Sequence, residues 1–181
     1  MTQDFTEKTV SSTVVYNGEF LEVRKDQSIL SDGAKATREV IVHPGASMII
    51  PIFHDRTILM ENQYRYAVGR HCLEFPAGKR DECETPLETA RRELLEETGY
   101  TAHFWKELIN IHPGVGYTNE QITLFIAEQL EMGVPNRDDG ELLESVCLTI
   151  DDAFSRFHAG EITDAKTIIG LFLVRHYCTR R

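Results

Sequence analysis

Residues 78–100 read GKRDECETPLETARRELLEETGY, and this stretch decides the fold. Thr85 is a good helix N-cap, Pro86 suits the first helical position, and Glu88 completes a capping box. Gly99 supplies the residue type that most readily takes the left-handed conformation after a helix. The stretch therefore predicts a helix that begins at Pro86 and ends just before Gly99.

Three glutamates give this helix an acidic flank. Glu93, Glu96 and Glu97 lie three and four residues apart, so their carboxylates share one side of the helix. Exposed like-charge pairs at this spacing cost about 0.2–0.5 kcal/mol each, and within the helix only Arg92 is placed to pair, with Glu96. A solvated acidic face is the common interpretation of a Glu-rich helix. A divalent cation would explain this cluster, and oxygen donors without a neighbouring Cys or His suit Mg²⁺ or Mn²⁺.

The composition is that of an ordinary globular domain. The chain has 181 residues, of which 41% are hydrophobic and 27% charged, enough for one domain with a full core. Its 19 basic and 29 acidic residues give a net charge of −10, which argues against a nucleic acid or an anionic membrane as partner. An acidic protein that handles phosphates needs bound metal or locally placed arginines.

The cysteines and the first residues indicate a cytoplasmic protein. Cys72, Cys83, Cys147 and Cys178 show no metal-ligand spacing, so we expect reduced thiols. The opening MTQDFTEK is polar, which gives no sign of a signal peptide, and no apolar run is long enough to span a bilayer.

The N-terminal part predicts a small antiparallel sheet. Asn17 and Gly18 form a hairpin turn signal, and three strands are expected at 13–16, 20–25 and 36–43, after a loosely ordered start. This piece has too little apolar content to stand alone, so it must pack on the rest of the chain or on a partner subunit. Pro44 and Gly45 mark the boundary, which gives domains 1–45 and 46–181.

The rest of the chain alternates strand and helix signals. Asp151 is expected to cap a short helix ending near Gly160, and Asp164 to cap the last helix. Strands are expected at 46–53, 57–64, 71–75, 102–110, 120–128 and 146–150. A mixed sheet with a central and a C-terminal helix is an α+β sandwich.

The helix and its preceding loop resemble a known family. Gly78, Glu84 and the run Arg92 to Tyr100 match the Nudix box at eight positions of fixed type and spacing. Tyr100 stands where the family usually has an aliphatic residue, a position that packs rather than reacts. The resemblance implies a Nudix-type α/β/α sandwich with a mixed sheet, and a metal-dependent pyrophosphatase.

The residues around the box are similar to those of ADP-ribose pyrophosphatases within that family. The matching phrases are Glu74 to Lys79 (EFPAGK), Gln63 to Tyr66, Thr37 to Val40, and Pro113-Gly114. They imply hydrolysis of ADP-ribose to AMP and ribose 5-phosphate. Two alternatives remain: a hydrolase of another nucleoside diphosphate sugar or of a dinucleotide, and a Nudix domain that binds a metabolite without catalysis.

The resemblance also assigns metal ligands. It implies that Glu93 and Glu97 bind the metal, that Glu96 shares a second ion, and that the carbonyl of Ala77 is a further ligand. Mg²⁺ is the expected cofactor, with Mn²⁺ possible. Glu84 and Arg92 are expected to form a structural pair that fixes the loop against the helix.

Substrate contacts are expected from both parts of the chain. The resemblance gives Arg38 and Arg65 as cations for the phosphates or ribose, although either could be a surface ion pair. Glu74 would accept hydrogen bonds from adenine or ribose, unless it is only a surface charge at a strand end. Gly114 belongs to the loop beyond the box. Tyr16 and Phe20 could stack on the base, but core packing is the better expectation.

The general base is expected outside the helix, whose carboxylates are committed to metal. Matching the acidic loop to the family favours Glu141 as base or late metal ligand, with Asp139 and Glu144 as alternatives. A plain solvated loop is the other interpretation. The resemblance further implies a homodimer in which the N-terminal piece crosses to the partner subunit and completes its site in trans.

Overall fold

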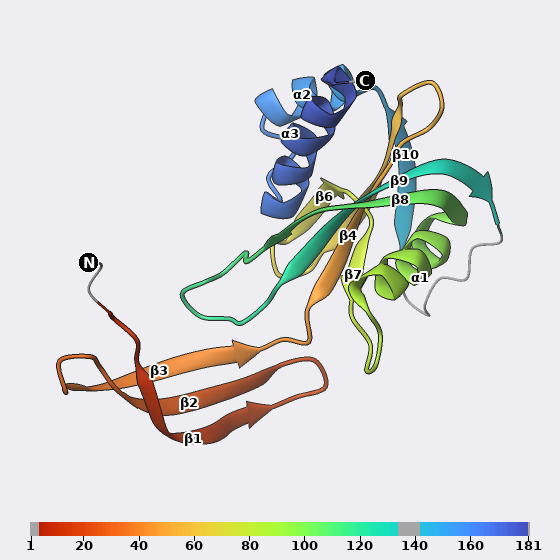
Figure 1. Cartoon of the computed structure of the whole chain (residues 1–181). Coiled ribbons are helices and arrows are strands. Elements are labelled where there is room, and N and C mark those ends of the chain that lie inside the picture. Colours follow the sequence, from red (N-terminus) through yellow and green to blue (C-terminus); the bar gives the residue numbers. More distant parts are fainter. Residues whose placement is uncertain (1–3, 134–141, 181) are drawn as a thin grey trace. The chain divides into compact units, whose positions relative to one another are not determined.

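The computed structural model describes residues 4–133 and 142–180 of the chain (Figure 1). These residues form two compact units, which are described separately. The first comprises Met1–Gly45 and Gly114–Gln121, and the second comprises Ala46–Pro113 and Ile122–Arg181.

The first unit is a three-stranded antiparallel sheet in the order β1-β2-β3. Its strands are β1 (Lys8–Asn17), β2 (Glu22–Ile29) and β3 (Lys35–Val42). The predicted hairpin is present. The expectation of a loosely ordered start up to about residue 12 is wrong, because β1 already pairs with β2 at Lys8. Every residue of β1 is exposed, and the strand is joined to the unit by its backbone pairing with β2.

A distant segment of the chain completes this unit. The amide of Ile41 donates to the carbonyl of Tyr117 at 2.8 Å, and Asn119 Oδ1 accepts from the amide of His43 at 2.7 Å. Residues 114–121 are thus joined to the end of β3 rather than to the strands that flank them in sequence.

The second unit is built on the four-stranded sheet β7-β4-β9-β8. Its strands are β4 (Ala46–Pro51), β7 (Ala77–Lys79), β8 (Tyr100–Ile111) and β9 (Ile122–Met132). β4 and β9 run parallel and the other pairs are antiparallel, so the sheet is mixed, as predicted.

A smaller antiparallel sheet and three helices complete the second unit. The sheet has the order β10-β5-β6, with β5 (Ile58–Arg65), β6 (Arg70–Glu74) and β10 (Leu143–Leu148). The helices are α1 (Pro86–Thr98), α2 (Ile150–His158) and α3 (Ala165–Thr179). None of the helices in the described ranges has the length and apolar character needed to cross a membrane.

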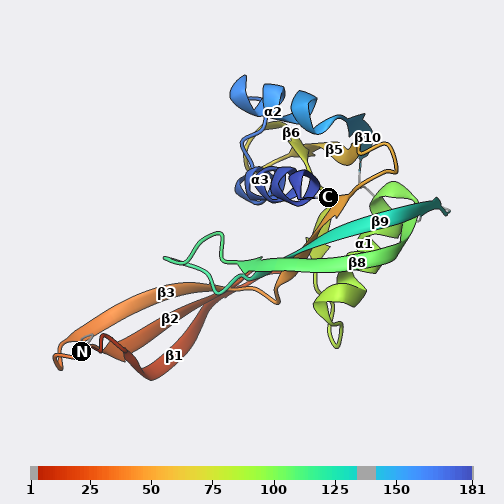
Figure 2. The same ribbon diagram turned by 45° about the horizontal axis from the view of Figure 1, so that its top comes forward.

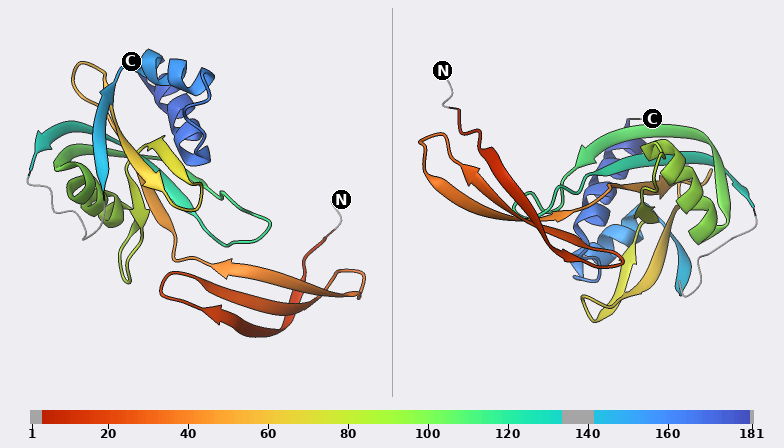
Figure 3. Two further views of the ribbon diagram at one scale, coloured as in Figure 1. Left: turned by 180° about the vertical axis from the view of Figure 1, so that it is seen from behind. Right: turned by 90° about the horizontal axis from the view of Figure 1, so that it is seen from below.

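Alternate residues of the central strands face different helices. Met48 and Ile50 belong to the large core formed with α2 and α3, whereas Ile49 packs with Ala90 and Leu94 of α1. Figures 2 and 3 show α1 on one side of the β8–β9 ribbon and α2 with α3 on the other. The expected α/β/α sandwich is therefore confirmed for this unit.

The observed helix ends show which capping residues were predicted correctly from the sequence. α1 has the predicted capping box at Thr85, and Gly99 takes the left-handed conformation with φ of 75°. Asp164 caps α3, accepting from the amide of Thr167 at 2.9 Å. For α2 the expected cap Asp151 is wrong. Thr149, two residues earlier, accepts the amide hydrogen bond, because Asp151 already lies inside the helix.

Candidate functional site

The site begins where β7 meets the start of α1. β7 pairs with β4 through Ser47 and Gly78, and the hydroxyl of Ser47 donates to the carbonyl of Pro86 at 2.7 Å. This buried contact ties the first turn of α1 to the central strand. The acidic flank of the helix is thereby held against the backbone of β7.

Two of the three flank glutamates are buried beside β7. Glu93 is 8% exposed and Glu97 is 3% exposed, so a solvated acidic face does not describe them. The amide of Ala77 donates to Glu97 Oε2 at 3.0 Å. A Cβ atom at Gly78 would overlap the carboxylate of Glu93, so only glycine leaves room for this arrangement. The structure thus brings Ala77, Glu93 and Glu97 together, as predicted.

Arg92 links the loop before the helix to the flank. Its Nε and Nη2 donate to the two carboxylate oxygens of Glu84 at 2.9 and 3.0 Å, which is the predicted structural pair. Its Nη1 also donates to Glu93 at 2.8 Å and to Glu96 at 3.0 Å. The expectation that Glu96 is the only flank carboxylate placed to pair with Arg92 is therefore wrong. The guanidinium is long enough to reach across the flank, although adjacent residues of a helix do not face each other.

The loop carboxylate Glu84 is strongly held in its ionised form. The hydrogen bonds from Arg92 lower the pKa of Glu84 to about 2, against a smaller opposing effect of burial. Thr89 Oγ1 and the amide of Asp81 also donate to it, at 2.8 and 3.2 Å. The same pairing raises the pKa of Arg92, so this ion pair persists across the working range of pH.

The donors at this flank suit a hard divalent cation. Glu93, Glu96 and Glu97 offer carboxylate oxygens, and the backbone of Ala77 lies beside Glu97. Within residues 4–133 and 142–180, no three His, Cys, Asp or Glu side chains already converge as a metal cage. Arg92 bridges two of the carboxylates, those of Glu93 and Glu96.

A second charged cluster lies at the end of β6. Glu74 is 4% exposed, and its oxygens accept from Nε and Nη2 of Arg65 at 2.8 and 3.0 Å. Lys166 of α3 also donates to Glu74 and lies 3.0 Å from Asp164. The interpretation of Glu74 as a surface charge is wrong. Burial works to raise the pKa of Glu74, but the two cations outweigh it and the pKa lies below its usual value.

Lys166 is the member of this cluster that sequence reasoning missed. It lies 92 residues after Glu74, in the first turn of α3, and no local spacing connects the two. The only signal in the sequence was a lysine in the first turn of a helix, where cations are unfavourable to the helix dipole. Such a lysine requires a nearby carboxylate, but the sequence does not say which one.

Arg38 and Gly114 belong to the first unit. Arg38 is exposed and its Nη2 donates to Glu7 at 2.6 Å, which is the surface ion pair considered above. Gly114 is buried, and a Cβ atom there would lie 2.7 Å from the ring of Tyr117, so the loop needs glycine at this position. Their expected contacts with substrate remain predictions.

The aromatic residues of the first unit are exposed. Tyr16 and Phe20 each have 57% of their surface accessible, so the expectation of core packing is wrong. Phe20 makes an edge-on contact with the ring of His43, 6.1 Å between centroids. The physical reason is that a single three-stranded sheet without a covering layer has no interior in which to bury both residues.

Two of the three base candidates, Asp139 and Glu141, lie outside the described residues. Glu144 is described, and the structure does not bring it to the helix carboxylates. It pairs with Asn62, whereas its neighbour Ser145 pairs with Glu61, so Glu144 faces the opposite side of the sheet from Glu61. There it lines a cavity of about 450 Å³ that includes Arg156 of α2.

Comparison with protein families places this site in context. The NUDIX domain model matches residues 42–169, and the model of the nucleoside diphosphate sugar hydrolase N-terminal domain matches residues 7–41. The matched ranges together include all the candidate residues discussed here.

Similar proteins are found along almost the whole chain. The methanol dehydrogenase activator of Bacillus methanolicus is 34% identical over 92% of this chain and 91% of its own length. The ADP-ribose pyrophosphatase of Bacillus subtilis is 33% identical over 89% of this chain and 88% of its own length. A crystal structure of an ADP compounds hydrolase superimposes with a TM-score of 0.87, at 22% identity, covering 98% of this chain and 97% of that one.

Proposed function

Because the chain belongs to the Nudix family of pyrophosphate hydrolases, we propose that it cleaves ADP-ribose to AMP and ribose 5-phosphate. The observation that carries this proposal is the placement of Glu93 and Glu97, buried against Ala77 by a glycine that leaves room for them. The similarity to an ADP-ribose pyrophosphatase, which extends over nearly nine-tenths of both chains, supports the choice of substrate.

Members of this family use divalent metals, and the acidic flank is the proposed place for one. Glu93, Glu97 and the carbonyl of Ala77 would hold the cation, and Glu96 would share a second. We propose Mg²⁺, with Mn²⁺ as the alternative, because every donor is an oxygen atom. When bound, the cation neutralises the diphosphate and acidifies a coordinated water molecule.

The remaining chemistry falls to side chains outside the helix. Glu141, or Asp139 in its place, would take the proton from the attacking water. The water oxygen forms a bond to one phosphorus and the bridging P–O bond breaks, which leaves one phosphate on each product. Arg65 and Arg38 would hold the anionic or sugar part of the substrate, for which a planar guanidinium is well suited.

A second substrate class is favoured by one observation. The match of residues 7–41 carries the description of a nucleoside diphosphate sugar hydrolase domain, which is broader than ADP-ribose. Other nucleoside diphosphate sugars are therefore the alternative substrates, followed by dinucleotides.

The test is a substrate panel with direct identification of products. Purified protein with Mg²⁺ is incubated with ADP-ribose, two other nucleoside diphosphate sugars and a dinucleotide, and the products are identified by mass spectrometry. ADP-ribose should be hydrolysed faster than the other substrates, and its products should be AMP and ribose 5-phosphate. Glu97→Gln should lose turnover by orders of magnitude, because it replaces a charged donor. Faster cleavage of another substrate, or full activity of Glu97→Gln, would contradict the proposal.

The assembly and compartment that we propose follow from the first unit and the cysteines. β1 buries none of its side chains, and Val14, Tyr16 and Phe20 are exposed, so this sheet gains from docking on a second copy in a homodimer. In such a dimer Arg38 would serve the partner's site. The four cysteines are free thiols, which suits a reducing cytoplasm.

A further inference from the structure

We propose that Lys166 is a positioning residue for the substrate: by sharing the charge of Glu74, it keeps Arg65 oriented and its positive charge available to the bound diphosphate. The inference rests on the proposed function, since it takes Arg65 as a substrate contact. It concerns a residue that lies on α3, outside both the Nudix box and the strand that carries Arg65.

The contacts divide Glu74 between two cations. Arg65 approaches side-on, with Nε on one carboxylate oxygen at 2.8 Å and Nη2 on the other at 3.0 Å. Lys166 donates to the oxygen that Nη2 also uses, and Asp164 lies 3.0 Å away on its far side. With both Nε and Nη2 directed at Glu74, the guanidinium plane is fixed, and its remaining donors point away from Glu74.

Burial explains why one cation is not enough. Glu74 pairs across β5 and β6 with Glu61, and each of these carboxylates is only 4% exposed. Cross-strand partners have Cβ atoms about 4.5–5.5 Å apart, so two acidic groups share a region from which water is excluded. A buried acid of this kind requires compensation by nearby positive charge. Lys166 supplies part of this positive charge, and its own side chain is only 14% exposed.

Arg65 interacts electrostatically with the helix carboxylate Glu97 as well as with Glu74. Its hydrogen bond to Glu74 is the main cause that raises its pKa, and Glu97 contributes to the same shift. The side chain is 40% exposed, which leaves the guanidinium accessible to a ligand. Hydrogen bonds and ion pairs thus connect Lys166 of α3 through Glu74 to Arg65 of β5.

Loss of Lys166 changes the net charge of the cluster around Glu74. Arg65, Lys166, Glu74 and Asp164 together carry no net charge, and without the lysine they carry −1. Arg65 then compensates Glu74 alone, so its attraction for an anionic substrate falls. The loss should weaken substrate binding and leave the chemical step unchanged, because the described ion pairs of Lys166 are with Glu74 and Asp164 and not with the acidic flank.

The experiment compares Lys166→Met with Arg175→Met. Arg175 is a cation of the same helix, but it pairs with the exposed Asp151. Lys166→Met should raise KM about tenfold with kcat changed less than about twofold, while Arg175→Met should change neither. Lys166→Arg should restore most of the loss. An unchanged KM in Lys166→Met, or a fall in kcat alone, overturns the proposal.

A double variant separates positioning from general stability. In Glu74→Gln the neutral amide needs no second cation, so adding Lys166→Met should leave KM as it is in Glu74→Gln alone. An equal rise of KM in both backgrounds would show that Lys166 acts independently of Glu74. This comparison also remains usable if Lys166→Met by itself folds poorly, because the double variant removes the buried negative charge of Glu74 together with the positive charge of Lys166.

A measurement on the protein without substrate tests the positioning role of Lys166 independently of which substrate is hydrolysed. The NMR signal of the Arg65 Nε–H group, identified by its loss in Arg65→Lys, should shift in Lys166→Met and stay in place in Arg175→Met. If ADP-ribose is not hydrolysed but the signal shifts as expected, the substrate assignment fails and the positioning role stands. A signal that does not move overturns the positioning role whatever the substrate.

Discussion

Gly78 and Glu93 show how a single missing side chain can shape a site. Gly78 pairs with Ser47 of β4, so its backbone is fixed by the sheet and cannot move away from the helix. The space that a Cβ atom would fill is occupied by the carboxylate of Glu93. Glycine is required here by close approach and not by an unusual backbone angle.

The first prediction follows from that contact. Gly78→Ala should reduce turnover by at least about a hundredfold, because the displaced Glu93 leaves the position from which it would bind metal. Steady-state kinetics at saturating Mg²⁺ measures this. Gly116→Ala is the control, since a Cβ atom there meets nothing within 4 Å, and it should keep normal turnover. Equal activity of the two variants would show that Glu93 does not depend on Gly78.

The second prediction concerns pH and Glu84. The pKa of Glu84 falls from an ordinary 4.5 to about 2 on folding, chiefly through Arg92. A lowered pKa in the folded state contributes stability that is present above about pH 4.5 and is lost as the pH falls toward 2. The difference in unfolding free energy between wild type and Glu84→Gln should therefore be full at pH 7 and shrink between pH 4.5 and 2.

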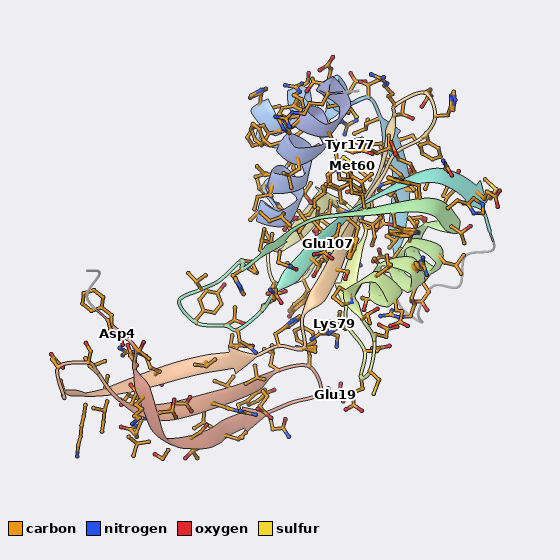
Figure 4. The ribbon with its side chains drawn as sticks, in the orientation of Figure 1. Asp4, Glu19, Met60, Lys79, Glu107 and Tyr177 are labelled. Carbon is orange, nitrogen blue, oxygen red and sulfur yellow. The ribbon has the colours of Figure 1, made fainter. Side chains whose placement is uncertain are left out.

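Urea unfolding at pH 7, 4 and 3 measures this difference. Glu107→Gln, which alters an exposed glutamate on β8 (Figure 4), is the control for removing an acid from the surface. A gap between wild type and Glu84→Gln that stays constant from pH 7 to pH 3 would mean that the ion pair with Arg92 adds no stability.

At the scale of elements, α1 depends on its first turn. The amide of Thr85 donates to Glu88 at 2.7 Å, and the amide of Glu88 donates to Thr85 Oγ1 at 3.3 Å. Thr85→Ala should lower the unfolding free energy by about 1 kcal/mol, whereas Thr85→Ser keeps the hydroxyl and should cost only a few tenths. Chemical denaturation of the three proteins measures both values. Equal losses in the two variants would exclude a capping role.

Sequence reasoning succeeded where the determining interactions are local. The ends of α1 follow from Thr85 and Gly99, which act within a few residues of themselves, and the Nudix box has a fixed spacing. The buried position of Met60 and Tyr177 in the core of the second unit (Figure 4), by contrast, depends on packing between distant segments.

The errors had physical causes of the same kind. Tyr16 and Phe20 have the alternation of a buried strand, but within residues 4–133 and 142–180 both stay 57% exposed. The long side chain of Arg92 bonds to the adjacent Glu93, which helix spacing does not predict, and Lys166 reaches Glu74 only through the tertiary fold. Periodicity cannot reveal such contacts, because it reports the exposure of one element and not the identity of its neighbours.

At the scale of the whole molecule, the proposed homodimer gives the last prediction. If Arg38 serves the partner's site, a mixture of Arg38→Ala and Glu97→Gln chains should regain activity. Random exchange would give half of the molecules as heterodimers, each with one intact site. Activity should thus return to about a quarter of the wild-type value. Light scattering should first show a dimer, and labelled chains should show exchange. No recovery of activity after complete exchange would show that Arg38 does not contribute to the partner's site.

The composition of the first unit from two separate segments has a consequence for how the chain folds during synthesis. β1 to β3 emerge from the ribosome first, but residues 114–121, which bond to Ile41 and His43, follow only after β8 has been made. Until then the end of β3 presents unpaired backbone groups while much of the second unit is still incomplete. During synthesis the nascent N-terminal sheet therefore keeps an open edge until residues 114–121 have been made.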